Sequence, residues 1–283
     1  MIKKIIVVLI LINSKFLFAQ SNNEYLFDLS AINPAAIVVE SSSISLFHSK
    51  KLSGIKDAPL TQNIRWKNSF GESNAIALNV QSLKKGVSGI ISYEFSYAFT
   101  AKVFAKNKLT LGLSSSLNTV YIDESLLVSG SDNDNLISGS YYSETLPNST
   151  AGIYFYNDKL KLGISTRNMF RNNIFSRSFD ETNAIEYISF IDYKFAFKQF
   201  QLNIGNATFI DNNNFNSKAH IIGKYKNIIL GSTYDALSSA GVIIGMKFKY
   251  MTFQYYYSTP QSVNKTLKLG GSEIKITYLI NSL

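Results

Sequence analysis

The stretch IKITYLI at residues 274–280 alternates side chains that prefer an apolar environment with others that include Lys275 and Thr277. Side chains in an extended strand point to opposite faces with a period of two, so this pattern predicts a strand that separates two environments. The same alternation occurs at 252–257 and at 218–226. A soluble β-sandwich separates two environments in this way, and so does a membrane β-barrel, whose outer face meets lipid and whose lumen meets water.

The composition favours strands and excludes several kinds of site. The chain has 283 residues, of which 46% are hydrophobic and 17% charged, with 20 Phe and 17 Tyr but only four Pro. Aromatic and branched residues favour strands. The mean hydropathy of +0.03 is low for a helical membrane protein, and no apolar run after residue 12 approaches the roughly 20 residues that a spanning helix needs. Cysteine is absent, so disulfides, thiolate metal sites, a cysteine nucleophile and a lipid-modified cysteine are excluded.

The N-terminus is typical of an export signal. Lys3 and Lys4 precede the apolar run 5–12, and residues 15–19 lead to a cleavage position before Gln20. We therefore predict a signal peptide at 1–19; its removal takes away three lysines and lowers the formal net charge from +9 to +6. In a membrane, an exported protein without a spanning helix can hydrogen-bond all of its backbone N–H and C=O groups only as a closed barrel.

Residues 20–40 differ from the rest of the chain. Pro34 fixes the backbone and provides no N–H group for a strand ladder. We predict an ordered periplasmic lead-in at 20–40 and a barrel over 41–283. The alternation within the barrel predicts about fourteen antiparallel strands, at 41–49, 59–68, 73–82, 86–100, 107–121, 148–157, 159–167, 185–198, 200–210, 216–226, 228–235, 239–248, 250–257 and 268–280.

The lengths of the connections alternate along the predicted strands. The odd-numbered ones include 50–58, 122–147, 168–184 and 258–267, whereas the even-numbered ones are tight turns at 69–72, 157–158, 199, 227 and 249. Short periplasmic turns and longer extracellular loops are typical of outer-membrane barrels, and a sandwich has no reason to keep this parity. The sequence therefore predicts an all-β transmembrane barrel in the outer membrane, in contact with its lipid.

Charged residues within the strands indicate which face is the lumen. In 185–198, Asp192 and Lys194 alternate with Tyr193 and Phe195. A charge on the lipid-facing surface costs several kcal/mol at the midplane, so the charged positions are expected to face the lumen. Lys218, Lys224 and Lys226 predict a basic interior in the same way, with some at the rim, where lysine side chains can reach water.

Four stretches resemble the PorP/SprF family of the Bacteroidetes type IX secretion system. They are Asn-Pro-Ala at 33–35; Gly-Ile at 54–55 with Ala-Pro-Leu-Thr-Gln at 58–62; Tyr-Ala-Phe at 97–99 leading to Leu-Thr-Leu-Gly-Leu at 109–113; and Leu-Gly at 230–231 with Tyr-Asp-Ala at 234–236 and Gly-Gly-Ser-Glu-Ile at 270–274. The chain departs from the family pattern in lacking a His after Ser272 and an Arg near 234–236, where Ser232 and Thr233 stand.

The resemblance implies a non-enzymatic outer-membrane component that assists secretion or surface attachment of particular cargo proteins, among them gliding adhesins, together with other components of the secretion system. The long outer loops offer a surface for such partners. We take Asp123, Glu124, Asp132 and Asp134 of the longest loop as candidate partner-binding residues. Neither a cofactor nor a nucleic acid is expected, since the positive charge is dispersed and no phosphate-binding loop occurs.

A diffusion channel or small-solute transporter is the main alternative, with 122–147 as a candidate constriction loop. Catalysis needs a nucleophile and a base that meet; the only histidines are His48 and His220, and His48 near Ser45 and Ser49 does not by itself make a triad. The acids of the longest loop lack the spacing and the closing Glu of an EF-hand, so no metal site is expected there.

Overall fold

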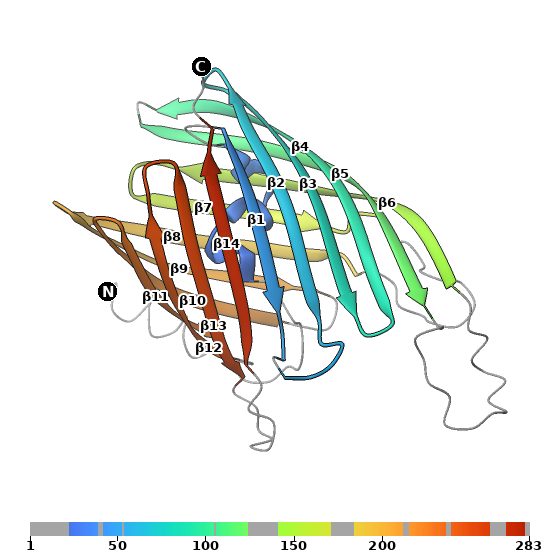
Figure 1. The fold of residues 1–283 in the computed structure, drawn as a ribbon. Coiled ribbons are helices and arrows are strands. Elements are labelled where there is room, and N and C mark those ends of the chain that lie inside the picture. The colour runs from blue at the N-terminus through green and yellow to red at the C-terminus, as the bar shows by residue number, and fades with distance from the viewer. Residues whose placement is uncertain are drawn as a thin grey trace, which may run out of the picture.

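The computed structural model describes residues 23–38, 42–52, 54–104, 106–123, 141–170, 184–211, 215–235, 239–260 and 270–280. Three 3-10 helices precede fourteen strands (Figure 1). The helices are η1 (Asn23–Leu26), η2 (Leu29–Ala31) and η3 (Pro34–Ile37). The strands are β1 (Ser43–Lys50), β2 (Leu60–Phe70), β3 (Asn74–Lys85), β4 (Ser88–Phe104), β5 (Asn107–Asp123), β6 (Tyr141–Tyr156), β7 (Leu160–Arg167), β8 (Glu186–Phe197), β9 (Phe200–Ile210), β10 (Phe215–Tyr225), β11 (Ile228–Asp235), β12 (Ser239–Lys247), β13 (Met251–Pro260) and β14 (Gly271–Leu279).

The strands form one closed barrel in which each pairs antiparallel with its neighbours in the sequence. The seam joins β1 to β14, from Ser43 opposite Leu279 to Lys50 opposite Ser272. Closure removes the free strand edges that would leave unpaired backbone groups in lipid, where each costs several kcal/mol. The predicted fourteen-stranded barrel is confirmed. No helix in the described ranges has the length and apolar character to cross a bilayer, a finding that concerns helices and not strands.

The largest difference from the expected strands lies at β6. It begins at Tyr141 rather than near 148, because its ladder with β5 continues out to the pair of Asp123 and Tyr141. The segment 141–147 lacks the apolar alternation on which the sequence prediction rested. The connection between β5 and β6 is therefore 124–140, shorter than the expected 122–147.

The two faces of the wall differ as the alternation predicted. On β8, Ile191 and Phe197 are 48% and 60% exposed on the outer face, while Asp192 is buried in the lumen. On β2, Arg65 and Lys67 face inward and Ile64 faces outward. The outer surface is therefore apolar, as contact with lipid requires.

The ends of the barrel differ in their connections. The even-numbered connections are two or three residues long, at 71–73, 105–106, 157–159, 198–199, 226–227 and 248–250, and we call this the short-turn end. The opposite long-loop end carries 51–59, 124–140, 168–185 and 261–270, together with the short connections 86–87, 211–214 and 236–238. The tight turns predicted from the sequence all lie at the short-turn end, whereas the long-loop end combines long connections with three short ones. In the shortest of these, 86–87, Gly86 has a φ of 58°.

Replacing Ile276 by proline is expected to prevent barrel assembly. Ile276 lies between Leu46 of β1 and Phe253 of β13 at the closing seam, and proline lacks the N–H group that a central strand needs. Heat-modifiable migration on a gel measures whether the folded barrel forms. The control Ile276→Val should migrate as the wild type does, and normal migration of Ile276→Pro would contradict closure at this seam.

Candidate functional site: a lumen filled by the N-terminal segment

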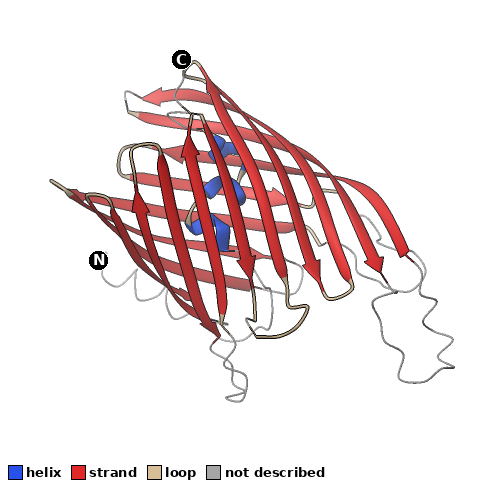
Figure 2. Cartoon of the chain, in the orientation of Figure 1, coloured by secondary structure: helices blue, strands red, loops and turns tan. Residues whose placement is uncertain are grey.

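Residues 23–38 lie inside the barrel, and we call this segment the lumen plug (Figures 1 and 2). Its short helices begin at capping residues. The carboxylate of Asp28 accepts a hydrogen bond of 3.0 Å from Ser30 N ahead of η2, and Asn33 Oδ1 accepts one of 2.8 Å from Ala35 N ahead of η3. Pro34 occupies the first turn of η3, where a missing N–H group carries no cost. The Asn-Pro-Ala sequence thus encodes a helix start.

The plug is anchored to the wall by polar contacts of Asn33 and Ile32. Asn33 is fully buried and its Nδ2 donates to the carbonyl oxygens of Ile153 and Ile164, at 3.0 and 3.1 Å, on β6 and β7. Ser165 Oγ donates to Ile32 O at 2.6 Å. The sequence predicted an ordered lead-in at 20–40, and its described part, 23–38, packs on the inner wall of the barrel.

A row of small inward residues makes the seat for η3. Ala75, Ala98, Gly112, Gly152 and Ser165 lie directly opposite one another across the five strands β3 to β7. A Cβ atom at Gly112 would fall within 2.5 Å of Ala35 Cα, and one at Gly152 within 2.8 Å of Asn33 Cγ. The backbone of the plug therefore approaches the wall more closely than any larger side chain would allow.

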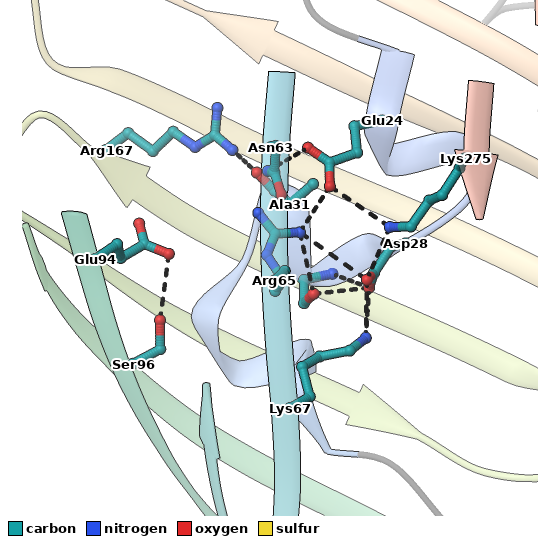
Figure 3. A network of polar contacts seen from close by, with 11 residues as sticks. Glu24, Asp28, Ala31, Asn63, Arg65, Lys67, Glu94, Ser96, Arg167 and Lys275 are labelled. Carbon is teal, nitrogen blue, oxygen red and sulfur yellow. Dashed lines mark hydrogen bonds and ion pairs between the residues drawn. The ribbon is translucent and has the colours of Figure 1, made fainter. Parts of the chain in front are cut away.

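Two carboxylates of the plug meet three cations of the wall (Figure 3). Glu24 lies 3.1 Å from Arg65 Nη1 and 3.5 Å from Lys275 Nζ, and Asn63 Nδ2 donates to it at 3.1 Å. Asp28 lies 2.8 Å from Lys67 Nζ, 3.1 Å from Lys275 Nζ and 3.9 Å from Arg65 Nη1. The three cations are buried. Because a buried charge is tolerated only when it is paired, the plug and the wall depend on each other.

A second polar cluster begins at Asn23, the first described residue of the plug. Its Oδ1 accepts from Lys218 Nζ at 2.8 Å, and its Nδ2 donates to Glu273 Oε1 at 3.0 Å. Glu273 is fully buried and also contacts Ser49 and Lys51, and Lys218 lies 3.5 Å from Asp235. Through these two clusters the plug is bound to β2, β10 and β14.

Acid should loosen the plug through Asp28, which lies outside the membrane-crossing strands. Burial by itself would raise the pKa of the Asp28 carboxyl, but Lys275, Lys67 and Arg65 overcome this effect and hold the pKa well below its ordinary value of 3.8. The contribution of Asp28 is therefore fully present above pH 3.8 and is lost as the pH falls through the lower pKa of the folded protein.

Planar-bilayer recordings measure this effect. We expect the wild type to begin to conduct as the pH falls below the ordinary carboxyl pKa, because protonated Asp28 no longer balances its three cations. The Asp28→Asn variant should lack this acid-dependent step. An identical acid response in both proteins would contradict the assignment of the effect to Asp28.

The plug lies between two cavities of the lumen. The cavity toward the short-turn end has a volume of ≈ 670 Å³ and includes Lys161, Lys224, Lys226, Lys247 and Asp192 in its lining; we call it the vestibule. The cavity toward the long-loop end has a volume of ≈ 170 Å³ and is lined by Ser, Asn and Gln side chains together with Arg65, Glu94 and Arg167. Glu94 accepts a hydrogen bond from Ser96, and Arg167 donates to Ala31 O of the plug.

The candidate partner-binding residues are only partly described. Asp123 ends β5 opposite Tyr141 at the long-loop end, whereas Glu124, Asp132, Asp134 and the predicted signal peptide at 1–19 lie outside the described residues. Within the described ranges no group of three His, Cys, Asp or Glu could hold a metal ion.

The two histidines lie on opposite faces of the wall. His48 is on the outer face of β1, so Ser45 and Ser49, which are buried on the inner face, do not meet it. His220 lines the lumen with its Nε2 3.6 Å from Asp192 Oδ2.

The ion pairs between the plug and the wall were not predicted from the sequence. Arg65 and Lys67 occupy alternate positions of the strand predicted at 59–68, a pattern that indicates lumen-facing charges as it does for Asp192. The two acids in 23–38, Glu24 and Asp28, gave a weak signal, because they lie four residues apart in a segment without lysine or arginine.

These features define a class: a fourteen-stranded barrel of the outer-membrane type with an apolar outer surface and a lumen filled by its own N-terminal segment. The sequence matches the family described as Type IX secretion system membrane protein PorP/SprF over residues 19–278. The chain belongs to this family, as its four sequence stretches suggested. It is a membrane protein of the type IX secretion system family.

Solved structures share the barrel at low sequence identity. The CymD monoaromatic hydrocarbon channel is 11% identical, with a TM-score of 0.54 over 93% of this chain and 94% of that one. The P. putida toluene transporter TodX is 10% identical, with a TM-score of 0.52 over 89% and 94% of the two chains. A Pseudomonas aeruginosa FadL homologue is 12% identical, with a TM-score of 0.50 over 89% and 94%. These likenesses concern the fold alone. No curated protein matches the sequence.

Proposed function

We propose that this protein is a non-enzymatic outer-membrane component of type IX secretion that assists secretion or surface attachment of particular cargo proteins, gliding adhesins being one class. In this role the short-turn end faces the periplasm, the long-loop end faces the outside, and the wall contacts outer-membrane lipid. Membership of the PorP/SprF family over 19–278 carries the proposal. The filled lumen supports it, because a plugged barrel is better suited to holding a partner than to passing a solute.

The deciding experiment is deletion of the gene followed by mass spectrometry of surface-exposed and secreted proteins. We expect one or a few large cargo proteins to disappear from the surface while the others persist, and complementation to restore them. An unchanged surface proteome would overturn the proposal. If uptake of a small solute fell at the same time, the channel function would replace it.

Cargo contact is proposed for the long-loop end, with Asp123, Glu124, Asp132 and Asp134 as candidate residues. Because Asp123 and Tyr141 are opposite each other, residues 124–140 can be replaced by an Asn-Gly turn that keeps both strands. We expect loss of cargo display with normal heat-modifiable migration. A Gly/Ser loop of the original length separates the need for loop sequence from the need for loop length, and full display with both replacements would exclude this loop as the contact.

The channel alternative makes an opposite prediction for the purified protein. Structural likeness to channels and transporters shows only the shared barrel. A channel should conduct with the plug in place, whereas a plugged partner-binding barrel should not conduct at neutral pH. Single-channel recording of the wild type distinguishes the two functions.

A further inference from the structure

The vestibule carries lysines that its own wall does not neutralise. Lys67 at its inner end is paired with Asp28 of the plug. By contrast, Lys161, Lys224, Lys226 and Lys247 form no ion pair with a carboxylate in the part of the chain that the structure describes. Asp192 is the one acid that the wall contributes to the vestibule, and His220 lies 3.6 Å from it. The cavity is therefore a basic site.

The rim around the vestibule has a net positive charge. The six connections of the short-turn end contain five lysines, namely Lys106, Lys159, Lys198, Lys226 and Lys249, and two acids, Glu72 and Asp158. Clefts lined by one sign of charge between low-dielectric walls concentrate counter-charged ligands and raise their rate of association. The geometry thus favours an anionic ligand that approaches from the short-turn end.

The lumen already binds one acidic peptide, which is the plug itself. Glu24 and Asp28 reach wall cations, and Asn23 supplies an amide to Lys218 and Glu273. The vestibule is continuous with this site, since Asp28 and Leu29 of the plug line it. Neutral hydrogen-bonding side chains also line it, among them Gln201, Asn203 and Gln254. This combination of lysines and amides suits the carboxylates and the backbone of a second peptide.

The segment that precedes the plug lacks the required charge. Residues 1–22 contain Lys3, Lys4 and Lys15 and no acid. A volume of ≈ 670 Å³ lies within the range of about 300–1,000 Å³ typical of ligand pockets. We infer that the vestibule binds an acidic peptide segment of another protein, which inserts through the short-turn mouth beside the plug. This inference goes beyond the proposed function and stands or falls without it.

The first test measures binding of a fluorescein-labelled decaglutamate peptide to the purified full-length protein in non-ionic detergent, by fluorescence anisotropy. The vestibule variant is Lys161→Gln/Lys224→Gln/Lys247→Gln. The matched control is Lys56→Gln/Lys84→Gln/Lys85→Gln, which removes the same charge at the long-loop end. We expect the vestibule variant to weaken binding about tenfold or more at low ionic strength, and the control less than about twofold. Equal loss in both variants, or no loss in either, would overturn the inference.

The second test locates the peptide, using the absence of cysteine from the chain. Asn203→Cys places a thiol in the vestibule, and Ser116→Cys places one in the cavity at the long-loop end. Decaglutamate should protect Cys at 203 from maleimide and leave Cys at 116 unprotected. Equal protection at both positions would show non-specific charge binding and contradict the site. Protection of position 203 by polyphosphate or inorganic phosphate but not by decaglutamate would make the ligand a phosphate and overturn the peptide assignment.

Discussion

Gly112→Ala is expected to dislodge the lumen plug and convert a closed barrel into a conducting one. A Cβ atom at this position would overlap backbone atoms of Pro34 and Ala35, with Ala35 Cα at 2.5 Å. Backbone atoms of a capped helix cannot turn aside as a long side chain can. Overpacking of this kind costs about 1–3 kcal/mol or more. The strand itself tolerates alanine, so the cost falls on the contact between β5 and η3.

Planar-bilayer recording at neutral pH measures the result. Gly223→Ala is the matched control, because it also adds one methyl group to a strand glycine, but on β10 its nearest neighbour would be the Phe200 ring at 3.3 Å. We expect steady conductance from Gly112→Ala and none from the control or the wild type. A Gly112→Ala protein that folds and stays closed would show that the plug does not depend on this seat.

Asp28→Ala is expected to expose the plug by removing the carboxylate that three buried cations share. Lys67 and Lys275 lie 2.8 and 3.1 Å from Asp28. Without Asp28, the single negative charge of Glu24 would face three positive charges, those of Arg65, Lys67 and Lys275. Breaking a buried ion pair by removing one partner costs about 3–5 kcal/mol. A loss of about 3 kcal/mol corresponds to a change of roughly a hundredfold or more in the equilibrium between docked and released plug.

A cysteine at Ala36, which is 9% exposed in the docked plug, reports this equilibrium through its rate of reaction with maleimide. The rate should rise strongly in Asp28→Ala. Glu72→Ala is the control, since it removes a carboxylate from the exposed rim pair with Lys102, where ion pairs contribute little, and the rate should not change. Equal rates in the three proteins would mean that the charge network does not hold the plug.

The wall of this barrel was predictable residue by residue from local pattern. Ile191 and Phe197 lie on the outer face and Asp192 lies in the lumen. A charged side chain on the lipid-facing surface would cost several kcal/mol of free energy. The face that a residue occupies depends on whether its position in the strand is odd or even, and this alternation is visible in the sequence. The start of β6 was not predicted because 141–147 lacks the alternation of apolar and polar residues. Pairing with β5 makes this segment a strand.

The plug could not be placed from local pattern. Asn-Pro-Ala indicates a capped helix start but does not say where the helix lies. Its place depends on contacts between residues that are far apart in the chain, such as Asn23 with Glu273 and Asp28 with Lys275. The sequence does not show that Gly112 and Gly152 form one contact surface for η3, because only the strand register places them opposite each other.

The sequence by itself thus determined a fourteen-stranded barrel, its two faces, the parity of its turns and its family. Only the tertiary structure decided that residues 23–38 fill the lumen, that Glu24 and Asp28 balance Arg65, Lys67 and Lys275, and that lysines of the vestibule remain without an acid partner in the described chain. The physical reason is that face selection in a strand is a local balance of solvation, repeated at every second residue. Charge pairing across a lumen depends instead on which distant residues the closed barrel brings within a few ångströms of one another.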